Sequence, residues 1–571
     1  MATHSVSIAF AGSGGAGVMT AGQILLDAAA KAGYYGLMTR SSGPQIRGGE
    51  AAAMVRIGTK PIAAVDDKFD VLIAFDWGNV HRFAAEIPLL PDSLILTDPS
   101  QGEIHAALLA YRTRVADLQM AALAKAIPGG RVNMVGLGAI AALIGLPIDT
   151  VVEVVSDQLK KKGPEALQAS AAAIRAGAEA TAGIESPAQL APALPSSVEH
   201  WNISGNEAAG LGAVRGGVRF CAAYPITPAT EVLEWLAPNL ADLGGVLVQA
   251  EDELASINMC LGASFGGVPS ITATSGPGLA LMIEAIGLGI ASETPVVVVD
   301  VMRGGPSTGI PTKSEQSDLN IAIYGMHGDA PHLVLAPNAI DDCVFTTQWA
   351  VHLAEALQCP AIVLSDQGMG QSRAVVDRPA DLAFIARRVT AEANTQDYRR
   401  YALTGTGVSP MAVPGTPGCM YTADGLEHNE RGTPSSQAAD HQKQMDKRAD
   451  KLADYDYGNH WADIEGDGEV AVITWGSITG AVREALDRMA ERGLKAKLIS
   501  VRLLTPVQPE KMAAALAGVK KALVIEQTHS AQFYHFLRAF YRLPAEVEVF
   551  HRPVPLPVRP GEIESKLAAW M

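Results

Sequence analysis

"FCAAYPITPATE", at residues 220–231, joins a run of small and apolar residues to a bend that contains two prolines. A residue that precedes proline is kept out of the helical conformation, so Pro225 and Pro228 fix a short rigid bend around Thr227. Two interpretations fit: a tight turn between a strand and a helix, or a bend that fixes the threonine hydroxyl in a binding site. In both, a strand ends shortly before a helix begins, which is the building unit of an α/β fold.

The same alternation repeats along the chain and predicts an α/β protein with three α/β domains. "VSIAFAG", "FDVLIAFDW" and "SLILTDPS" are apolar runs of strand length, and alanine-rich helical patterns lie among them. A proline-rich linker follows the first block. A polar segment follows the second, and it is too long for an ordinary loop, which favours a functional or interface role. The predicted boundaries are 1–185, 186–202 (linker), 203–376, 377–468 (polar segment) and 469–571.

Composition excludes some classes of function. The chain has 571 residues, 48% of them hydrophobic, and a net charge of −16. This acidic balance argues against nucleic acid as a partner, since phosphates need a basic face. Residues 1–17 show no basic start, so no signal peptide is predicted. The longest apolar stretch, residues 134–148, is shorter than the roughly 20 residues of a membrane-spanning helix and predicts a buried helix instead.

The spacing of the cysteines is not typical of secreted or metal-binding proteins. The five cysteines, Cys221, Cys260, Cys343, Cys359 and Cys419, are scattered, and no two have CxxC spacing. A disulfide framework or a self-contained zinc or iron–sulfur site is therefore not predicted. We expect a cytoplasmic protein without a metal site of its own and without a membrane contact.

A glycine-rich turn opens the first block. "AGSGGAGVMTAG", residues 11–22, has GxGxxG spacing between a strand and a helix, where backbone amides can cradle an anion. A dinucleotide site also needs an acid about 20 residues later, and residues 31–49 contain none, which disfavours NAD or FAD. Tight strand–helix packing and binding of another phosphate or carboxylate both stay open. The candidate anion contacts are Gly12, Gly14, Gly15, Gly17 and Arg47.

A second motif, Gly466-Asp467-Gly468, looks like the metal motif of thiamine-diphosphate enzymes. That motif requires an asparagine some 25 to 30 residues later, and this chain has no asparagine after Asn459. The three residues also precede a predicted strand, where the metal motif follows one. They are predicted to form a turn.

Four stretches of the second block place polar residues where strands end. They are "YPITPATE" (224–231), "VQAEDELASINMCLGAS" (248–264), "TATSGPGLALMIEAIG" (272–287) and "VMRGGPSTGIPTKSEQSDL" (301–319). Ligands of open α/β sheets bind at the carboxyl ends of strands, so these residues are expected to converge at one crevice. Each stretch also has a purely structural interpretation as a charged helix start, a helix cap or a surface loop.

The chemistry expected at that crevice is proton transfer beside a carboxylate-binding cation. A carboxylate that enters a helix with a small, apolar body would be partly buried, and burial raises its pKa toward the range useful for proton transfer. The candidates for this carboxylate are the three acids of "QAEDE", Glu251, Asp252 and Glu253. An arginine facing it, Arg303, would bind a carboxylate substrate.

These stretches closely resemble the pyrimidine-binding domain of 2-oxoacid:ferredoxin oxidoreductases, to which "YPITP" and "RGGPSTGIPT" are specific. The resemblance covers nearly the whole chain: the first block is similar to the gamma-type, Rossmann-like domain of that family, and the third to its transketolase C-terminal-like domain. A gamma domain ahead of an alpha domain, with a "GTGVSPMAVPG…LEHNERG" segment, is most similar to the alpha subunits that act on 2-oxoglutarate.

The resemblance implies roles for individual residues. Glu251 matches the glutamate that protonates the aminopyrimidine ring of thiamine diphosphate, because the family pattern makes the first acid of "QAEDE" the catalytic one. Thr227 and Arg303 match the residues that bind the 2-oxoacid. The implied cofactor-binding residues are Tyr224, Pro225, Ile226, Glu251, Thr274, Ser275 and Gly276.

The resemblance also implies cofactors and partners. Thiamine diphosphate would lie between this chain and a beta subunit that carries the GDG…N site for Mg²⁺ and a [4Fe–4S] cluster, so this chain alone should be inactive. Coenzyme A is the implied co-substrate, and the glycine loop of the first block could hold its phosphates. Electrons would pass to ferredoxin. An alpha2beta2 heterotetramer would interconvert 2-oxoglutarate and succinyl-coenzyme A in either direction.

Two alternatives stay open. The same chemistry could act on pyruvate or a branched-chain 2-oxoacid, because no side chain in the sequence decides the substrate's length. The chain could also be a non-catalytic nucleotide-binding scaffold that uses only the first glycine loop.

Overall fold

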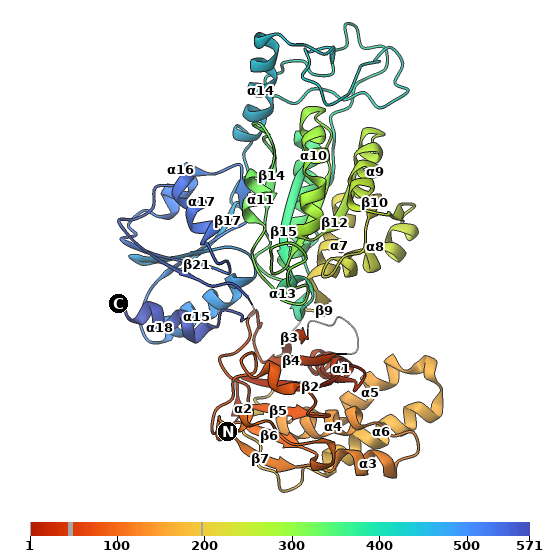
Figure 1. Cartoon of the computed structure of the whole chain (residues 1–571), viewed down its shortest axis with the longest axis vertical. Coiled ribbons are helices and arrows are strands. Elements are labelled where there is room, and N and C mark those ends of the chain that lie inside the picture. The colour runs from red at the N-terminus through yellow and green to blue at the C-terminus, as the bar shows by residue number, and fades with distance from the viewer. Residues whose placement is uncertain (1, 44–48, 196–197, 555, 571) are drawn as a thin grey trace. The chain divides into compact units, whose positions relative to one another are not determined.

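The computed structural model describes the chain except for residues 1, 44–48, 196–197, 555 and 571. It forms two compact units whose segments are interleaved in sequence (Figure 1). The first unit comprises Met1–Ser204, Gln371–Ala380 and Leu556–Trp570, and the second comprises Gly205–Gly370 and Asp381–Pro555. The first unit is thus completed by two short segments from later in the chain.

The first unit is built on an eight-stranded mixed sheet of order β7-β6-β5-β2-β4-β3-β16-β9. In this order its strands are Arg114–Asp117, Leu94–Thr97, Val71–Ala74, Ser5–Ser13, Glu50–Gly58, Tyr35–Ser42, Arg373–Asp377 and His200–Ser204. A short parallel pair, β1 (Ala2–Thr3) with β8 (Gln189–Leu190), lies beside it. The helices are α1 (Val18–Lys31), α2 (Ala106–Leu109), α3 (Met120–Ala126), α4 (Val132–Ile144), α5 (Ile148–Gln158), α6 (Pro164–Glu179) and α18 (Pro560–Ala568).

The apolar stretch 134–148 lies mostly in α4, which is almost completely buried, as the sequence predicts. Small residues let it pack very closely on α6. A Cβ at Gly138 would lie 1.9 Å from the carbonyl oxygen of Ile174, and a Cβ at Gly177 would lie 1.9 Å from that of Val135. No helix among the described residues combines the length and the apolarity needed to cross a membrane.

The second unit contains a seven-stranded sheet of order β11-β10-β12-β13-β15-β14-β20. Its strands in this order are Val246–Gln249, Phe220–Ala223, Ser270–Thr274, Val297–Met302, Ala361–Asp366, Leu333–Leu335 and Leu503–Thr505. All neighbours are parallel except β20, which pairs antiparallel with β14. The helices are α7 (Gly205–Gly216), α8 (Thr230–Asp242), α9 (Glu253–Phe265), α10 (Gly276–Ala291), α11 (Leu319–Tyr324), α12 (Asp342–Leu357) and α13 (Gln367–Gly370).

The strand order reverses between β10 and β12. The chain moves from β10 through α8 to the outer strand β11, and then returns through α9 to β12 on the other side of β10. Right-handed crossovers put α8 and α9 on opposite faces, and the packing agrees: α8 contacts α7, which packs on α12, whereas α9 contacts α10. Such a reversal is where open α/β sheets bind ligands.

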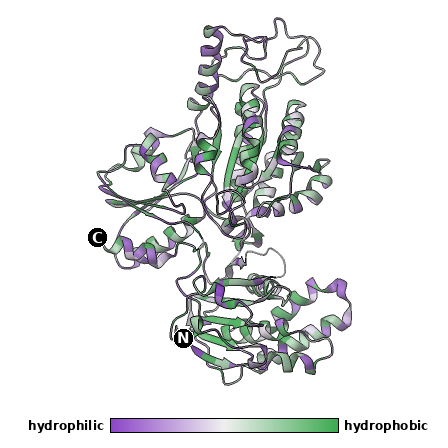
Figure 2. Cartoon of the chain, in the orientation of Figure 1, coloured by the Kyte–Doolittle hydropathy of each residue, from purple (hydrophilic) through white to green (hydrophobic). Residues whose placement is uncertain are grey.

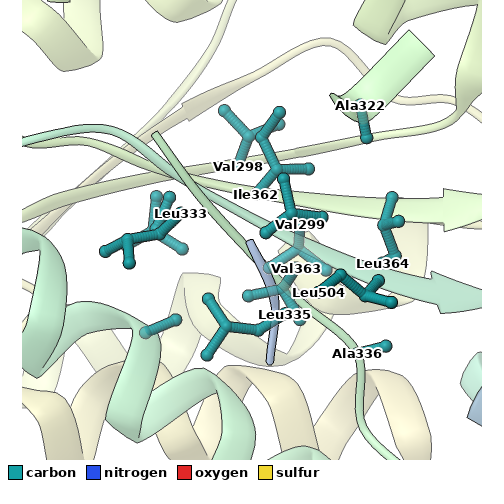
Figure 3. Packing of buried hydrophobic residues seen from close by; sticks show 14 of the residues in the cluster. Val298, Val299, Ala322, Leu333, Leu335, Ala336, Ile362, Val363, Leu364 and Leu504 are labelled. Carbon is teal, nitrogen blue, oxygen red and sulfur yellow. The ribbon is translucent and has the colours of Figure 1, made fainter. Parts of the chain in front are cut away.

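The core of this sheet is formed by β-branched and leucine side chains of its inner strands. Figure 3 shows Val298 and Val299 of β13 beside Ile362 and Val363 of β15, with Leu504 of β20 packed against them. These strands are among the hydrophobic elements in Figure 2, as expected for parallel strands covered on both faces.

The C-terminal domain of the second unit has its own five-stranded sheet of order β17-β19-β18-β21-β22. Its strands in this order are Ala462–Glu465, Lys497–Val501, Val470–Thr474, Lys521–Glu526 and Glu546–His551, and its helices are α15 (Thr479–Glu491), α16 (Pro509–Ala515) and α17 (Gln532–Phe540). β17 is antiparallel to β19, and the other pairs are parallel. The chain is thus mixed α/β with three main sheets, as predicted.

The polar segment contains β17 near its end and otherwise has little regular structure apart from α14 (Ala438–Ala453), which is largely hydrophilic in Figure 2. It covers the C-terminal end of α10, where Glu293 is completely buried. Lys447 and Lys451 both form ion pairs with the Glu293 carboxylate, the latter at 2.8 Å, and Arg400 donates to the Glu293 carbonyl oxygen at 2.8 Å. Cations at a helix C-terminus also match the sign of the helix dipole.

Candidate active site

The carboxyl ends of β10, β12 and β13 meet at the strand-order reversal. The register pairs Ala223 of β10 with Gln249 of β11, and Thr274 of β12 with Asp300 of β13, so these four strands end at one edge. The proline bend around Thr227 follows β10 directly, and Arg303 follows β13. The predicted convergence of these strand ends is present.

Arg303 connects two of these ends. Its side chain is 7% exposed and donates a hydrogen bond from Nη1 to the carbonyl oxygen of Thr227. Its Nε has no partner among the described residues. Burial lowers the pKa of Arg303, and the nearby carboxyls of Asp318 and Asp300 oppose that shift. The guanidinium is thus held against the bend, and its Nε–H is buried without a partner in the described part of the chain.

The three acids of "QAEDE" take three different positions. Glu251 is exposed in the single chain, so the protein alone does not supply the burial expected for it. Asp252 is the N-cap of α9 and accepts from the Ala255 amide at 2.7 Å. Glu253, the first residue of α9, is only 7% exposed.

Helix geometry explains this division. Side chains in a helix point toward its N-terminus, so the first-turn residue Glu253 is directed back to the strand ends, whereas Glu251 precedes the helix. A Cβ at Gly278 would lie 2.6 Å from Oε1 of Glu253 and 2.1 Å from Oγ1 of Thr274. The carboxyl of Glu253 therefore lies between the end of β12 and the first turn of α10, and it is the buried acid at the reversal.

A second pair of acids lies beside Arg303. Asp300 of β13 is completely buried, and no N–H or O–H of the described residues donates to either of its carboxylate oxygens. Burial, with a further contribution from the neighbouring Asp318 carboxyl, raises its pKa well above the ordinary value. Burial also raises the pKa of Asp318, to about 6, although the nearby Ser317 hydroxyl, 3.2 Å away, opposes that shift.

Asp318 in turn touches the start of α10, because a Cβ at Gly276 would lie 2.5 Å from its Oδ1. Thr274 and Ser275 are both completely buried at this point, and the Ser275 hydroxyl lacks a partner within the described part of the chain. Glycine at 276 and 278 is what lets two carboxyls approach the helix backbone. The result is a site with a buried acid, an arginine and an unsatisfied hydroxyl.

The remaining predicted residues line the bend. Tyr224 is 41% exposed, and Pro225, Ile226 and Thr227 are half-buried. An apolar bend beside a buried carboxyl could hold a flat heterocyclic base and give or take a proton at a ring nitrogen. Within the described ranges, no group of three or more His, Cys, Asp or Glu residues could hold a metal ion.

Sequence reasoning missed Glu253, Asp300 and Asp318. Asp300 had a signal: it is the single charge in "PVVVVDVM", and an unpaired charge in a buried parallel strand needs a reason. Glu253 could have been chosen over Glu251 by placing the start of α9 at the N-cap Asp252. Asp318 had no local signal, because only the tertiary fold brings it to Gly276.

The glycine loop of the first unit already contains an internal carboxylate. Asp76 accepts from the amide and the hydroxyl of Ser13 at 2.8 and 2.7 Å, and a Cβ at Gly12 would lie 3.2 Å from its Oδ2. The amide of Gly14 donates to the Gly49 carbonyl at 2.6 Å. Part of the donor set expected for an anion is therefore used internally, while Gly17 is the N-cap of α1. Arg47 lies outside the described residues.

The GDG motif forms the connection between β17 and β18, as predicted for a turn. Asp467 pairs with Lys495 at 3.2 Å on the surface, and Gly466 has a φ of 71°, a left-handed conformation that glycine favours. This motif lies outside the site at the strand-order reversal.

Three family models match consecutive parts of the chain. Residues 7–180 match the pyruvate ferredoxin/flavodoxin oxidoreductase family. Residues 211–447 match the thiamine diphosphate-binding domain of pyruvate flavodoxin/ferredoxin oxidoreductase, and residues 468–547 match core domain II of pyruvate:ferredoxin oxidoreductase. The candidate site falls within the second match.

Individual proteins agree with these matches. The chain is 36% identical to the 2-oxoglutarate synthase subunit KorA of Methanothermobacter marburgensis, over 65% of this chain and 98% of that one. It is 31% identical to the 2-oxoglutarate oxidoreductase subunit KorA of Mycobacterium tuberculosis, over 94% and 87%. The solved 2-oxoglutarate:ferredoxin oxidoreductase from Magnetococcus marinus, with 2-oxoglutarate, coenzyme A and succinyl-CoA bound, is 38% identical, with a TM-score of 0.92 and 99% of both chains covered.

Proposed function

The chain belongs to the 2-oxoacid:ferredoxin oxidoreductase family, and from that premise we propose that it is the alpha subunit of an enzyme that acts on 2-oxoglutarate. The reaction joins 2-oxoglutarate and coenzyme A to give succinyl-coenzyme A and CO₂, and two electrons pass one at a time to ferredoxin. The reverse carboxylation uses the same groups. The observation that carries the proposal is a buried carboxyl and a buried arginine at the strand-order reversal of a thiamine diphosphate-binding domain.

Arg303 and Thr227 bind the 2-oxoacid in this proposal. The guanidinium lies beside the bend around Thr227 and supplies the positive charge that a carboxylate needs. Its bond to the Thr227 carbonyl fixes the distance between arginine and bend, so that the threonine hydroxyl and the guanidinium contact one substrate. The preference for 2-oxoglutarate over other acids rests on the relatives named above.

The residues at the reversal fit thiamine diphosphate. This cofactor supplies a carbon nucleophile that adds to the 2-oxo group and stabilises the negative charge left by loss of CO₂. Glu253, buried against Thr274, would hold a proton at a nitrogen of the aminopyrimidine ring, and Ile226 and Pro225 would line that ring. We assign the proton to Glu253, the acid that this chain shields by itself; the alternative is Glu251, which is exposed in the single chain and which the cofactor and the beta subunit would cover.

A beta subunit completes the enzyme in this proposal. It would hold the diphosphate through Mg²⁺ and carry the [4Fe–4S] cluster that passes electrons to ferredoxin, in an alpha2beta2 assembly. The turn formed by Gly466–Gly468 lies away from the site and is no substitute for that metal motif. We place the enzyme in the cytoplasm, and the glycine loop of the first unit contributes amide donors toward coenzyme A, apart from those that Asp76 already uses.

The test is a purification of the tagged chain with its co-purifying partner, followed by anaerobic viologen reduction with coenzyme A and a panel of 2-oxoacids. Reduction with 2-oxoglutarate, together with a brown iron–sulfur partner, is the expected result. Reduction with pyruvate or branched-chain acids alone would keep the mechanism and reject the substrate. No reduction with any acid would reject the proposed function.

A further inference from the structure

The segment that carries Arg303 forms a closed loop between β13 and α11. The amide of Gly304 donates to the Lys313 carbonyl at 3.0 Å, and that of Ile310 donates to the Gly304 carbonyl at 2.7 Å. The hydroxyl of Ser317 donates to the Arg303 carbonyl at 2.8 Å, so the last turn of the loop holds its first residue. Any displacement of Ser317 is therefore transmitted to Arg303.

The far side of this loop is bound by the C-terminal domain. Gln316 is 1% exposed; its Nε2 donates to the Trp475 carbonyl at 2.8 Å, and its Oε1 accepts from the Gln527 amide at 2.8 Å. The backbone amide of Gln316 also donates to the Gln527 carbonyl at 3.0 Å. Both ends of the buried side-chain amide are thus used between the two domains.

A second amide reaches the loop from the other direction. Gln532, the first residue of α17, donates from Nε2 to the Ser317 carbonyl at 3.1 Å and accepts from the Asn320 amide at 3.0 Å. Gln316 and Gln532 therefore bracket Ser317, the residue whose hydroxyl holds Arg303. Hydrogen bonds are directional, so four such side-chain bonds fix the orientation of the loop and not merely its burial.

We propose that Gln316 and Gln532 are positioning residues: through them, the C-terminal domain sets the aim of Arg303 at the substrate. The inference rests on the proposed function for the identity of the ligand. Neither glutamine touches the reacting atoms, and their effect passes through Ser317 and the loop backbone. The C-terminal domain, which contributes no residue to the candidate active site described above, thereby becomes part of substrate binding.

Asn338 offers a matched control. It is 2% exposed and links the same two domains, donating from Nδ2 to Asp463 at 3.0 Å and to the Ser500 carbonyl at 3.2 Å, and accepting from the Gly476 amide at 3.2 Å. It lies outside the loop. Gln316→Ala and Asn338→Ala each remove a buried interdomain amide. Gln316→Ala releases the loop directly, whereas Asn338→Ala frees the Gly476 amide of the Trp475–Gly476 peptide and leaves the bonds of both glutamines to the loop in place.

The experiment compares Gln316→Ala, Gln532→Ala and Asn338→Ala in the assembled enzyme. Binding of a carboxylate is shared by ground and transition states, so each glutamine variant should raise KM for 2-oxoglutarate by about tenfold with little change in kcat. Asn338→Ala should lower the thermal unfolding midpoint about as much as Gln316→Ala does, and it should leave KM for 2-oxoglutarate unchanged. Gln532→Glu keeps the bond from Asn320 and should give an intermediate KM.

A second readout separates this inference from the proposed function. Hydrogen exchange of the backbone amides at residues 303–318 should accelerate in Gln316→Ala but not in Asn338→Ala, whatever substrate the enzyme uses. A KM in Gln316→Ala equal to that in Asn338→Ala, or unchanged exchange of the loop, would overturn the positioning role. If none of the 2-oxoacids supports viologen reduction by the unmodified complex, the proposed function fails. The exchange result alone then decides whether the glutamines hold the loop.

Discussion

The two ends of α10 hold two buried charge clusters of opposite design. At the C-terminal end, the carboxylate of Glu293 meets Lys447 and Lys451, and Arg400 holds its backbone. At the N-terminal end, Asp300 and Asp318 share one arginine, Arg303, which donates to the carbonyl oxygen of Thr227. One end has more basic than acidic groups, and the other has more acidic than basic groups.

The pKa shifts express the same difference. Burial alone would raise the pKa of Glu293, but Lys451, Lys447 and Arg400 bring it below its ordinary value. At the other end burial dominates, and the pKa values of Asp300 and Asp318 are raised. A satisfied cluster stabilises the fold, whereas acids with raised pKa values resist ionisation and so compensate less of the positive charge that Arg303 offers to an anion. α10 thus connects an anchored end to a reactive end.

The largest expected effect is on turnover. Glu253→Gln keeps the size of the side chain but replaces the carboxyl by an amide that cannot act as an acid or base, and we expect turnover of the assembled enzyme to fall by about 10²- to 10⁴-fold. Glu251→Gln, at the exposed acid two residues earlier, should stay near the unmodified rate. Viologen reduction under saturating 2-oxoglutarate measures both, and the reverse ranking would return the proton to Glu251.

The next effect is on stability at the anchored end. Glu293→Gln leaves two buried lysines without their carboxylate, and we expect a loss of about 3–5 kcal/mol in the free energy of unfolding at neutral pH. The folded-state pKa of Glu293 is lowered, so its contribution is present above about pH 4 and is lost as the pH falls below that. Chemical denaturation of the assembled enzyme at pH 7 measures the loss, and turnover per folded molecule should not change.

Two further variants isolate the cause. Burial lowers the pKa of Lys447 to about 8 despite the attraction of Glu293, so keeping this lysine charged in the folded chain reduces the free energy of unfolding. Adding Lys447→Met to Glu293→Gln should therefore recover part of the lost stability. Glu469→Gln, which breaks an exposed pair with Lys520 at 2.6 Å, should leave the denaturation midpoint unchanged. An equal loss in Glu469→Gln would mean that charge removal as such, and not burial, is responsible.

More of the fold than of the site could be predicted from the sequence, for a physical reason. Hydrophobic period and strand length are local properties, so "PVVVVDVM" and "PAIVLSD" identify β13 and β15 without knowledge of their neighbours. The convergence of Thr227 and Arg303 also followed, because parallel strands end at one edge. Local patterns cannot show that β16, far along the chain, pairs with β3 and β9 of the first unit.

The side chains inside the site needed the tertiary structure. Choosing among three adjacent acids requires the residue at which α9 begins, and a shift of two residues changes an exposed carboxyl into a buried one. The contacts of Asp318 with Gly276, and of Gln316 with Trp475 and Gln527, join segments far apart in sequence. No spacing rule within one element could have suggested them.

The smallest expected effect is a gain of stability at the reactive end, and it depends on pH. The pKa of Asp318 is raised to about 6 in the folded chain, so between about pH 4 and pH 6 the folded state binds more protons than the unfolded state, and ionisation above that range costs stability. Asp318→Asn removes this cost. We expect it to raise the free energy of unfolding by about 2 kcal/mol at pH 8 and by much less at pH 4.5.

Thermal unfolding of the assembled enzyme at the two pH values measures this difference. Asp467→Asn, at an exposed acid on the surface turn, should show no gain at either pH. Equal stability of Asp318→Asn and the unmodified chain at pH 8 would mean that Arg303 already compensates both acids, and the contrast between the two ends of α10 would disappear. A gain at pH 8 that vanishes in acid would show that the chain keeps an unfavourable charge beside Arg303, as expected of a residue pair retained for binding rather than for stability.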